Sequence, residues 1–332
     1  MEKILKNLAF LLIILITLMT SPKVGLSQVS LPPVNLGGTS FMDALSFPGH
    51  ILVLQQIGIF YHAYRFYMQD EKIPGDNELS SFTTQTQIIY QPPFTILGGH
   101  PALNFLFQLA VLSADTDFPL TVSSDVLADL IIGPLIQWPD RRLFGKPFYQ
   151  RLALDFILPT GSYRSQFNIN PGSNVFSINP YYAFTYFFTD DRRLEFSLRS
   201  HYLWNSKNAD PPEISLPPTP TNPNGQIIQF DNIQPGQAVH FNFGLSYELI
   251  PNFRIGVNGY YLKQITNDKI NGEEVPGSKE QVLGIGPGFM VRYGTFLVFF
   301  NSFFETLAED RPQGFTFILR FLTFVPFGKG GR

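Results

Sequence analysis

The stretch from Ala238 to Leu249 constrains the fold of this chain more than any other. If it forms an extended strand, one side carries only apolar residues and the other carries polar residues and glycine. The apolar side is Val239, Phe241, Phe243, Leu245, Tyr247 and Leu249, and the other side is His240, Asn242, Gly244, Ser246 and Glu248. A soluble sheet can show this alternation on one strand, but a transmembrane barrel must repeat it on every strand. Whether the chain forms such a barrel therefore depends on whether its other strands repeat this alternation.

The alternation recurs along most of the chain. Twelve strand candidates occupy residues 51–68, 80–91, 101–113, 126–138, 148–158, 175–188, 193–204, 238–249, 253–266, 281–292, 295–306 and 314–323. The pattern is poor in residues 51–68 and 126–138, and the second of these could contain a short helix.

The connections between the candidates alternate between long and short. Asp190-Asp191, Pro251-Asn252 and Gly294 read as tight turns, whereas Asn205 to Gly236 reads as a long, proline-rich loop without an apolar period. A barrel with an even number of strands and both termini in the periplasm places long loops outside the cell and short turns inside. We therefore predict an all-β fold, a transmembrane antiparallel β-barrel of about 12 strands over residues 51–327, with residues 328–332 as a tail.

Composition agrees with a membrane barrel and excludes other classes. Charged residues make up 15% of the chain, and there are 34 Phe and 14 Tyr, whereas soluble domains carry roughly 25% charged residues. No apolar run beyond the N-terminus is long enough for a membrane helix. The absence of cysteine excludes disulfides and a lipid anchor. A net charge of −3 gives no indication of a nucleic-acid partner.

The two N-terminal segments have different predicted roles. Residues 1–27 combine a basic start, an apolar run and small residues near Ser27, which predicts a cleaved signal peptide and export to the bacterial outer membrane. An uncleaved anchor helix is the alternative. Residues 28–50 have no sustained period, so we expect an irregular segment that lies in the periplasm or plugs the lumen, with Gly37, Gly38 and Asp43 as plug residues.

Gly284, Gly286 and Gly288 leave one strand face bare. The backbone around Gly37-Gly38 could approach this face. Barrel curvature alone would also explain the three glycines.

Two histidines are predicted to face each other inside the barrel. If Trp204 pairs with Gln237 across the long loop, His201 lies opposite His240 and Arg199 lies opposite Asn242. We predict a polar, partly cationic constriction near the outer mouth that titrates near neutral pH and could contact a ligand. The alternative is that these are ordinary solvated lumen residues. A metal site is not expected, because spacing places no third ligand.

The same register places Glu248 opposite Arg193 and, across the next turn, near Arg254. This predicts a charge cluster at the periplasmic end. Such a cluster either holds the wall together or filters charged solutes.

Pro134, Pro180 and Pro287 fall inside strand candidates, where each removes a donor from the hydrogen-bond ladder. Each should mark a bulge or a gap. The functional interpretation is a lateral gate into the bilayer, and the alternative is an adjustment of curvature.

Five stretches resemble a family of outer-membrane barrels named for the meta-pathway of phenol degradation, including its sphingosine-responsive members. They are V-N-L-G-G-T-S-F-M-D (34–43), N-P-G-S-N-V-F-S-I-N-P-Y-Y-A-F (170–184), Y-L-W-N-S-K-N (202–208), Y-Y-L-K-Q-I-T-N-D (260–268) and E-Q-V-L-G-I-G-P-G (280–288). The resemblance implies an outer-membrane location and a similarity to transporters of hydrophobic compounds. It carries over no functional residue.

These observations predict an outer-membrane channel for small hydrophobic or aromatic compounds that works by passive diffusion and needs no cofactor. Leu203, Leu262 and Phe303, apolar residues on the predicted inner face, favour an apolar solute. The partners expected are outer-membrane lipid and lipopolysaccharide; the oligomeric state stays open.

Two other functions are alternatives to the channel. One is a structural or surface-interaction barrel with a closed lumen. The other, a membrane hydrolase, is disfavoured because Ser200 and His201 point to opposite faces and no catalytic motif is present, so we predict no enzyme and no catalytic residue.

Overall fold

The computed structural model describes residues 31–32, 34–212, 214–216 and 226–327, so the predicted signal peptide and C-terminal tail lie outside the described residues. Within these ranges, twelve long strands form the main sheet. They are β1 (Ile51–Met68), β3 (Asn77–Gln91), β4 (His100–Thr116), β5 (Leu130–Leu143), β6 (Lys146–Leu158), β7 (Ser177–Phe187), β8 (Leu194–Asn205), β12 (Ala238–Ile250), β13 (Phe253–Gln264), β16 (Gln281–Tyr293), β17 (Phe296–Glu309) and β18 (Pro312–Pro326).

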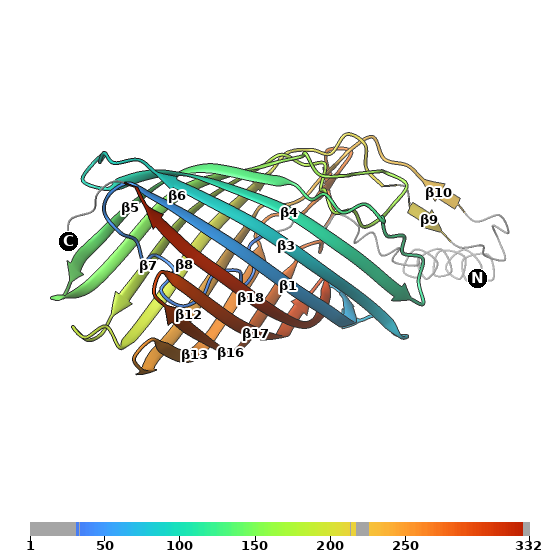
Figure 1. Ribbon diagram of the computed structural model, residues 1–332. Helices are drawn as coiled ribbons and strands as arrows, with labels where there is room; N and C mark the ends of the chain where they lie inside the picture. Colours follow the sequence, from blue (N-terminus) through green and yellow to red (C-terminus); the bar gives the residue numbers. More distant parts are fainter. Residues whose placement is uncertain (1–30, 33, 213, 217–225, 328–332) are drawn as a thin grey trace, which may run out of the picture.

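The sheet closes on itself. Each long strand pairs antiparallel with its neighbours in the chain, and β18 pairs with β1 from Ile51 opposite Pro326 to Phe66 opposite Pro312 (Figure 1). The closed barrel therefore has no long unpaired edge, which is how such folds avoid edge-to-edge aggregation. The predicted antiparallel barrel of about 12 strands is confirmed. β2 (Glu71–Lys72) adds a short hairpin at the end of β1.

The region in which a short helix was considered contributes to β5 instead. Among the described residues there is no helix long and apolar enough to cross a membrane.

The connections sort by end, with two exceptions. One end, here called the short-turn end, carries residues 92–99, 144–145, 188–193, 251–252 and 294–295. The opposite, long-loop end carries residues 117–129, 159–176, 206–237 and 265–280. The exceptions are residues 69–76, which are no longer than 92–99, and residues 310–311, a tight turn at the long-loop end. The predicted alternation of long and short connections therefore fails at the first and last hairpins, although the strand count is right.

Short strands tie the long loops together. β11 (Ile233–Gln234) pairs with β14 (Lys269–Ile270), which joins two neighbouring loops, and β14 also pairs with β15 (Glu273–Glu274). β9 (Ile214–Leu216) pairs with β10 (Gln226–Ile228) within the proline-rich loop.

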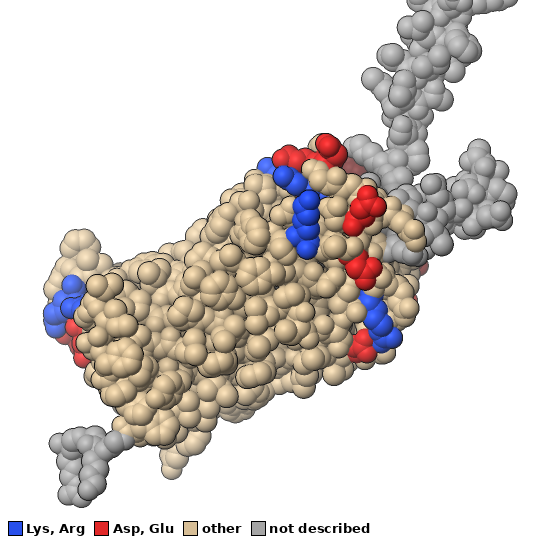
Figure 2. All heavy atoms as spheres, turned by 90° about the horizontal axis from the view of Figure 1, so that it is seen from above, with Lys and Arg blue, Asp and Glu red and all other residues tan. Residues whose placement is uncertain are grey.

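The outer surface is apolar between two charged ends. On β12, Leu245, Tyr247 and Leu249 are exposed, whereas His240 and Asn242 are buried. On the face shown in Figure 2, Lys, Arg, Asp and Glu gather near the two ends and a broad band of other residues lies between them. This is the arrangement that a lipid bilayer requires of a barrel wall.

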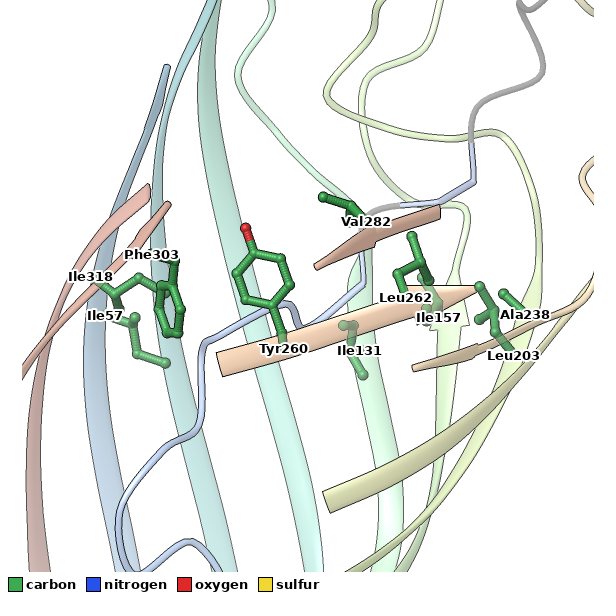
Figure 3. Close-up of a cluster of buried hydrophobic side chains, with 10 residues drawn as sticks. All are labelled: Ile57, Ile131, Ile157, Leu203, Ala238, Tyr260, Leu262, Val282, Phe303 and Ile318. Atoms are coloured by element: carbon green, nitrogen blue, oxygen red, sulfur yellow. The ribbon is translucent and has the colours of Figure 1, made fainter. Parts of the chain in front are cut away.

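Apolar side chains also pack inside the barrel. A cluster of ten fully or nearly buried residues lines the lumen from strands on all sides (Figure 3): Ile57, Ile131, Ile157, Leu203, Ala238, Tyr260, Leu262, Val282, Phe303 and Ile318. Leu31, Val34 and Leu36 of the N-terminal segment pack against this cluster. The lumen is therefore partly filled by the chain's own N-terminal part.

Residues 31–50, here called the N-terminal segment, run through the lumen from end to end. At the long-loop end the backbone N–H of Leu31 donates to Glu280 Oε1 at 2.9 Å. At the short-turn end Gln91 Nε2 donates to the carbonyl of Phe47 at 2.9 Å, and the Phe47 ring stacks on Phe324 with 4.7 Å between centroids. The segment then turns back into β1.

Candidate functional site

A cavity of about 350 Å³ lies between the N-terminal segment and the barrel wall. Its lining on β1 extends from Ile51 to Tyr61, about 33 Å at the usual rise of a strand. The lining residues therefore extend along much of the length of a membrane-spanning strand. The volume of the cavity lies in the range of small-molecule pockets, roughly 300–1,000 Å³.

Amide side chains line one wall of the cavity and bond to each other. Gln85 donates to Gln108 at 2.7 Å and Gln91 accepts from Gln137 at 2.5 Å. Gln55 and Gln87 are also paired, and Gln87 donates to Asn104 at 2.8 Å. The wall is therefore polar, and most of its hydrogen bonds are made between its own amides, although Gln55 Oε1 has no partner among the described residues.

Aliphatic and aromatic residues form much of the rest of the lining, beside charged groups that include Asp43, Arg199 and Arg320. They include Val53, Ile57 and Ile59 of β1, Ile89 of β3, Phe299 of β17 and Phe324 of β18. A solute in the cavity would therefore meet both apolar side chains and amide groups.

Asp43 anchors the N-terminal segment to the wall opposite the amides. Its carboxylate accepts from Arg199 Nε at 2.7 Å and from Arg199 Nη2 at 2.5 Å, and both side chains are at least nine-tenths buried. The next residue, Ala44, donates its backbone N–H to Thr185 Oγ1 at 3.0 Å. The Arg199 guanidinium also lies over the Tyr181 ring, 4.3 Å from its centroid. A bidentate pair of this kind fixes both position and orientation.

Gly37 and Gly38 lie where the segment crosses the apolar cluster. Gly37 has a φ of +75°, and a Cβ at this position would lie 2.6 Å from the Phe303 ring, so both backbone and space require glycine. Its N–H donates to Asn242 Oδ1 at 2.7 Å. The carbonyl of Gly38 accepts from Arg320 Nη1 at 3.2 Å. Asn242 thus holds the segment rather than facing open solvent.

The predicted register of the histidine pair is observed, but the solvated environment considered as the alternative is not. His201 pairs with His240 and Arg199 pairs with Asn242 across β8 and β12. The two imidazoles stack with 4.0 Å between centroids, are buried, and have no hydrogen-bond partner on their ring nitrogens within the described residues. The alternative that these are ordinary solvated lumen residues is therefore wrong, because both histidines are shielded from water inside the filled barrel. The polar constriction stays a prediction.

The predicted charge cluster at the short-turn end is only partly assembled. Arg254 Nη2 lies 3.6 Å from Glu248 Oε2 and donates to the carbonyl of Arg192 at 2.7 Å. Arg193 instead donates to the backbone carbonyls of Glu248 and Leu249, at 3.0 and 3.1 Å. The Glu248 carboxylate therefore does not lie between two guanidiniums, since Arg193 bonds to main chain and covers the Tyr247 ring at 4.9 Å.

The three strand prolines leave gaps in the ladder without a bulge. Pro134, Pro180 and Pro287 each keep their pairing with one neighbour, and the pairing with β6, β8 and β17 respectively is interrupted and resumes in the same register. At Pro287 a side chain bridges the gap, because Ser302 Oγ donates to the Pro287 carbonyl at 3.0 Å. The prediction that each proline marks a bulge or a gap is confirmed, and in all three cases the feature is a gap.

The glycines of β16 make room for side chains, not for the N-terminal segment. A Cβ at Gly284 would overlap the Tyr260 ring, and one at Gly288 would meet the amides of Asn258 and Asn301. The segment approaches Gly244 of β12 instead, where a Cβ would lie 3.1 Å from Phe41. The expected approach of Gly37-Gly38 to these glycines is therefore wrong.

Sequence reasoning missed a polar cluster near the long-loop end. Glu305 accepts from the Tyr61 hydroxyl at 3.0 Å and from the Tyr260 hydroxyl at 2.8 Å, and Arg311 lies 3.5 Å from Glu280. The alternation on β17, which points Phe303 inward, could have placed Glu305 on the same inner row. Within the described residues, no group of three or more His, Asp or Glu side chains is arranged to hold a metal ion.

Taken with its apolar outer band, the closed twelve-strand barrel is that of an outer-membrane β-barrel. The chain belongs to the family described as "Putative MetA-pathway of phenol degradation", whose profile matches residues 65–321. The resemblance noted in the sequence is thereby confirmed.

Solved structures show the same fold. An outer membrane channel from Pseudomonas putida F1 is similar, with a TM-score of 0.72 and 13% identity over 86% of this chain and 100% of that chain. The KdgM porin has a TM-score of 0.41 and 8% identity over 82% and 98%. A deletion mutant of TodX, a monoaromatic hydrocarbon channel, has a TM-score of 0.43 and 7% identity over 84% and 90%. At these TM-scores the last two support no conclusion about this chain. No curated protein matches the chain.

Proposed function

We propose that this protein is an outer-membrane channel through which small hydrophobic or aromatic compounds diffuse passively. The observation that carries the proposal is the long cavity beside the N-terminal segment, which follows β1 from Ile51 to Tyr61 and is lined by aliphatic, aromatic and amide side chains. A solute of this kind would exchange contacts with the wall along the axis, and no step requires chemical change.

A second function has an observation in its favour. The N-terminal segment fills part of the lumen, and its Phe41 side chain is buried against Phe299 and Leu297. A barrel blocked in this way could serve as a structural or surface-interaction protein whose long loops do the work.

A hydrolase is the least supported alternative. Ser200 pairs with Phe241 on the outward row, while the neighbouring His201 points inward and stacks on His240. The serine and the histidine therefore do not form a nucleophile and base, which need to be within hydrogen-bond reach of each other.

Uptake of radiolabelled phenol by a Gram-negative host that lacks its general porins tests the channel. Val53 lines the cavity, whereas its neighbour Leu54 faces the bilayer. We expect Val53→Trp to reduce uptake several-fold and the matched control Leu54→Trp to leave it unchanged. Different gel mobility of boiled and unboiled samples shows that each variant forms a closed barrel.

One result would contradict the channel, and another would show that the route lies outside this cavity. If cells with the wild-type protein take up phenol no faster than cells without it, and deletion of residues 31–47 does not increase uptake, the closed barrel is favoured. Equal uptake by the two tryptophan variants would place the route outside this cavity, and the interrupted ladders at Pro134 and Pro180 would then be the place to test for lateral exit.

A further inference from the structure

Three guanidiniums from different walls lie within electrostatic range of one carboxylate in the lumen. Arg151 of β6, Arg199 of β8 and Arg320 of β18 all act electrostatically on Asp43 of the N-terminal segment. All four residues line the 350 Å³ cavity. Only Arg199 forms an ion pair with Asp43, so the other two arginines contribute positive charge that this carboxylate does not balance.

Arg320 is the more exceptional of the two. Its side chain is 4% exposed, Nη1 donates to the carbonyl of Gly38 at 3.2 Å, and Nε has no hydrogen-bond partner among the described residues. Its guanidinium lies 3.9 Å from the centroid of the Phe299 ring. A buried donor without a partner is costly, and a buried cation without a counter-ion more so.

Arg151 is satisfied only by a neutral group. Its Nε and Nη2 donate to Gln137 Oε1 at 3.2 and 3.1 Å. Neither Arg151 nor Arg320 has a carboxylate within 4.0 Å in the part of the chain that the structure describes.

One further acid acts on this group and does not cancel its charge. Asp155 interacts with Arg151 and Arg199 and bonds to Asn104 at 3.2 Å. It lines a separate cavity of about 40 Å³ and not the larger one. Even if Asp155 is ionised, three guanidiniums face two carboxylates.

The cavity wall next to Arg320 is apolar. Leu297, Phe299, Leu322 and Phe324 line the same cavity, and Phe41 and Met42 of the N-terminal segment pack with them. A ligand that fits this surface has an anionic head for the guanidiniums and an apolar body for the rings.

We propose that the solute of this channel is a small organic acid with an apolar or aromatic body, and that its carboxylate binds Arg320 and Arg151 in turn as it passes through the lumen. The proposal rests on the channel function proposed above and narrows its solute class. The fork of donors by which Arg199 binds the Asp43 carboxylate shows, in the same lumen, the geometry that a solute carboxylate would use. A mobile anion at this position supplies the charge that the wall lacks.

Equilibrium binding of radiolabelled probes to the full-length protein in detergent tests the site. Benzoate, benzamide and benzylammonium have nearly the same size and differ in charge at neutral pH. We expect benzoate to bind at least tenfold more tightly than the other two, since hydrogen bonds to charged groups typically change affinity by about 10- to 100-fold.

Three variants distinguish binding at this site from general attraction of an anion to positive charge. Arg320→Gln and Arg151→Gln should each weaken benzoate binding by about tenfold, as expected for the loss of one charge-assisted contact. Arg142→Gln removes a guanidinium that is exposed at the short-turn end and paired with Asp190, and it should change nothing. If Arg320→Gln does not form a closed barrel, as judged by the different gel mobility of boiled and unboiled samples, benzoate binding by Arg151→Gln on the opposite wall tests the proposal.

Equal affinity for benzoate and benzamide, or unchanged benzoate binding in a folded Arg151→Gln variant, would overturn the carboxylate site. Phenol uptake measured in cells is independent of this result. Uptake without benzoate selectivity would leave the channel standing and remove the site, whereas selective binding without any uptake would support the site and remove the channel.

Discussion

The buried ion pair between Asp43 and Arg199 should hold the N-terminal segment in the lumen, and Asp43→Asn tests this directly. The side chains of the pair are 5% and 7% exposed. Removal of one partner from a buried pair leaves the other charge uncompensated and typically costs about 3–5 kcal/mol. If this cost falls on docking of the segment, the undocked population rises by at least about 100-fold.

Hydrogen exchange followed by mass spectrometry measures that population. The backbone N–H groups of Gly37 and Ala44 are bonded to the barrel wall at 2.7 and 3.0 Å and exchange only when the segment leaves it. Their exchange should accelerate by at least about the same factor of 100 in Asp43→Asn.

Asp190→Asn is the matched control, because its pair with Arg142 is about 60% exposed and such pairs are worth roughly 0–1 kcal/mol. Exchange at Gly37 and Ala44 within threefold of the wild-type rate, in a variant that still forms a barrel, would refute the view that this ion pair holds the segment.

Two further predictions concern packing and pH. Gly284→Ala should destabilise the barrel by about 1–3 kcal/mol through overpacking, because its methyl group would overlap the Tyr260 ring. Gly58→Ala should be tolerated, because the nearest atom to its methyl group would lie at 3.9 Å. Equal denaturant midpoints for the two variants would contradict this prediction. Burial raises the pKa of Asp268, at the long-loop end, to about 7. The N–H of Gly236, which donates to its carboxylate at 2.7 Å, lowers this pKa but does not offset the effect of burial. Because this folded-state pKa lies above the unfolded value near 3.9, the stabilisation is complete at low pH and lost as pH rises through about 7. Exchange at Gly236, corrected for intrinsic rates, should therefore accelerate in the wild type as pH rises from about 4 to about 7 and level off above it, and it should not do so in Asp268→Asn. The same pH profile in both would rule out Asp268 as the cause.

The barrel itself could be predicted from sequence because its constraints are local. Alternation on β12 assigns every residue to the lipid or the lumen, and a shift by one residue would reverse the assignment. The same constraint fixed the pairing of His201 with His240 across a loop of some thirty residues. Strand ends were less certain: the strand predicted at 126–138 is observed as Leu130–Leu143, since the inner and outer rows say little about where pairing stops.

The environment of the lumen residues could not be predicted in the same way. The N-terminal segment has no period, and its partners are distant in sequence: Asp43 and Arg199 are 156 positions apart. Its path depends on the shape of the finished lumen, on a left-handed glycine at Gly37 and on the space beside Phe303. For this reason register placed the histidine pair correctly but did not show that the pair is shielded from water.

The position of the segment also decides which wall is free. Its hydrogen bonds go mainly to one side of the barrel, through Thr185, Ser197, Asn242 and Asn301 on β7, β8, β12 and β17. On β1, β3 and β4 the side-chain amides of Gln55, Gln85, Gln87 and Gln108 bond to one another in pairs instead and line the cavity. The inner rows thus divide into a side that binds the segment and a side left for a solute, with Arg151 and Arg320 at the boundary between them. The segment and a solute that follows the cavity would therefore contact different walls of the lumen.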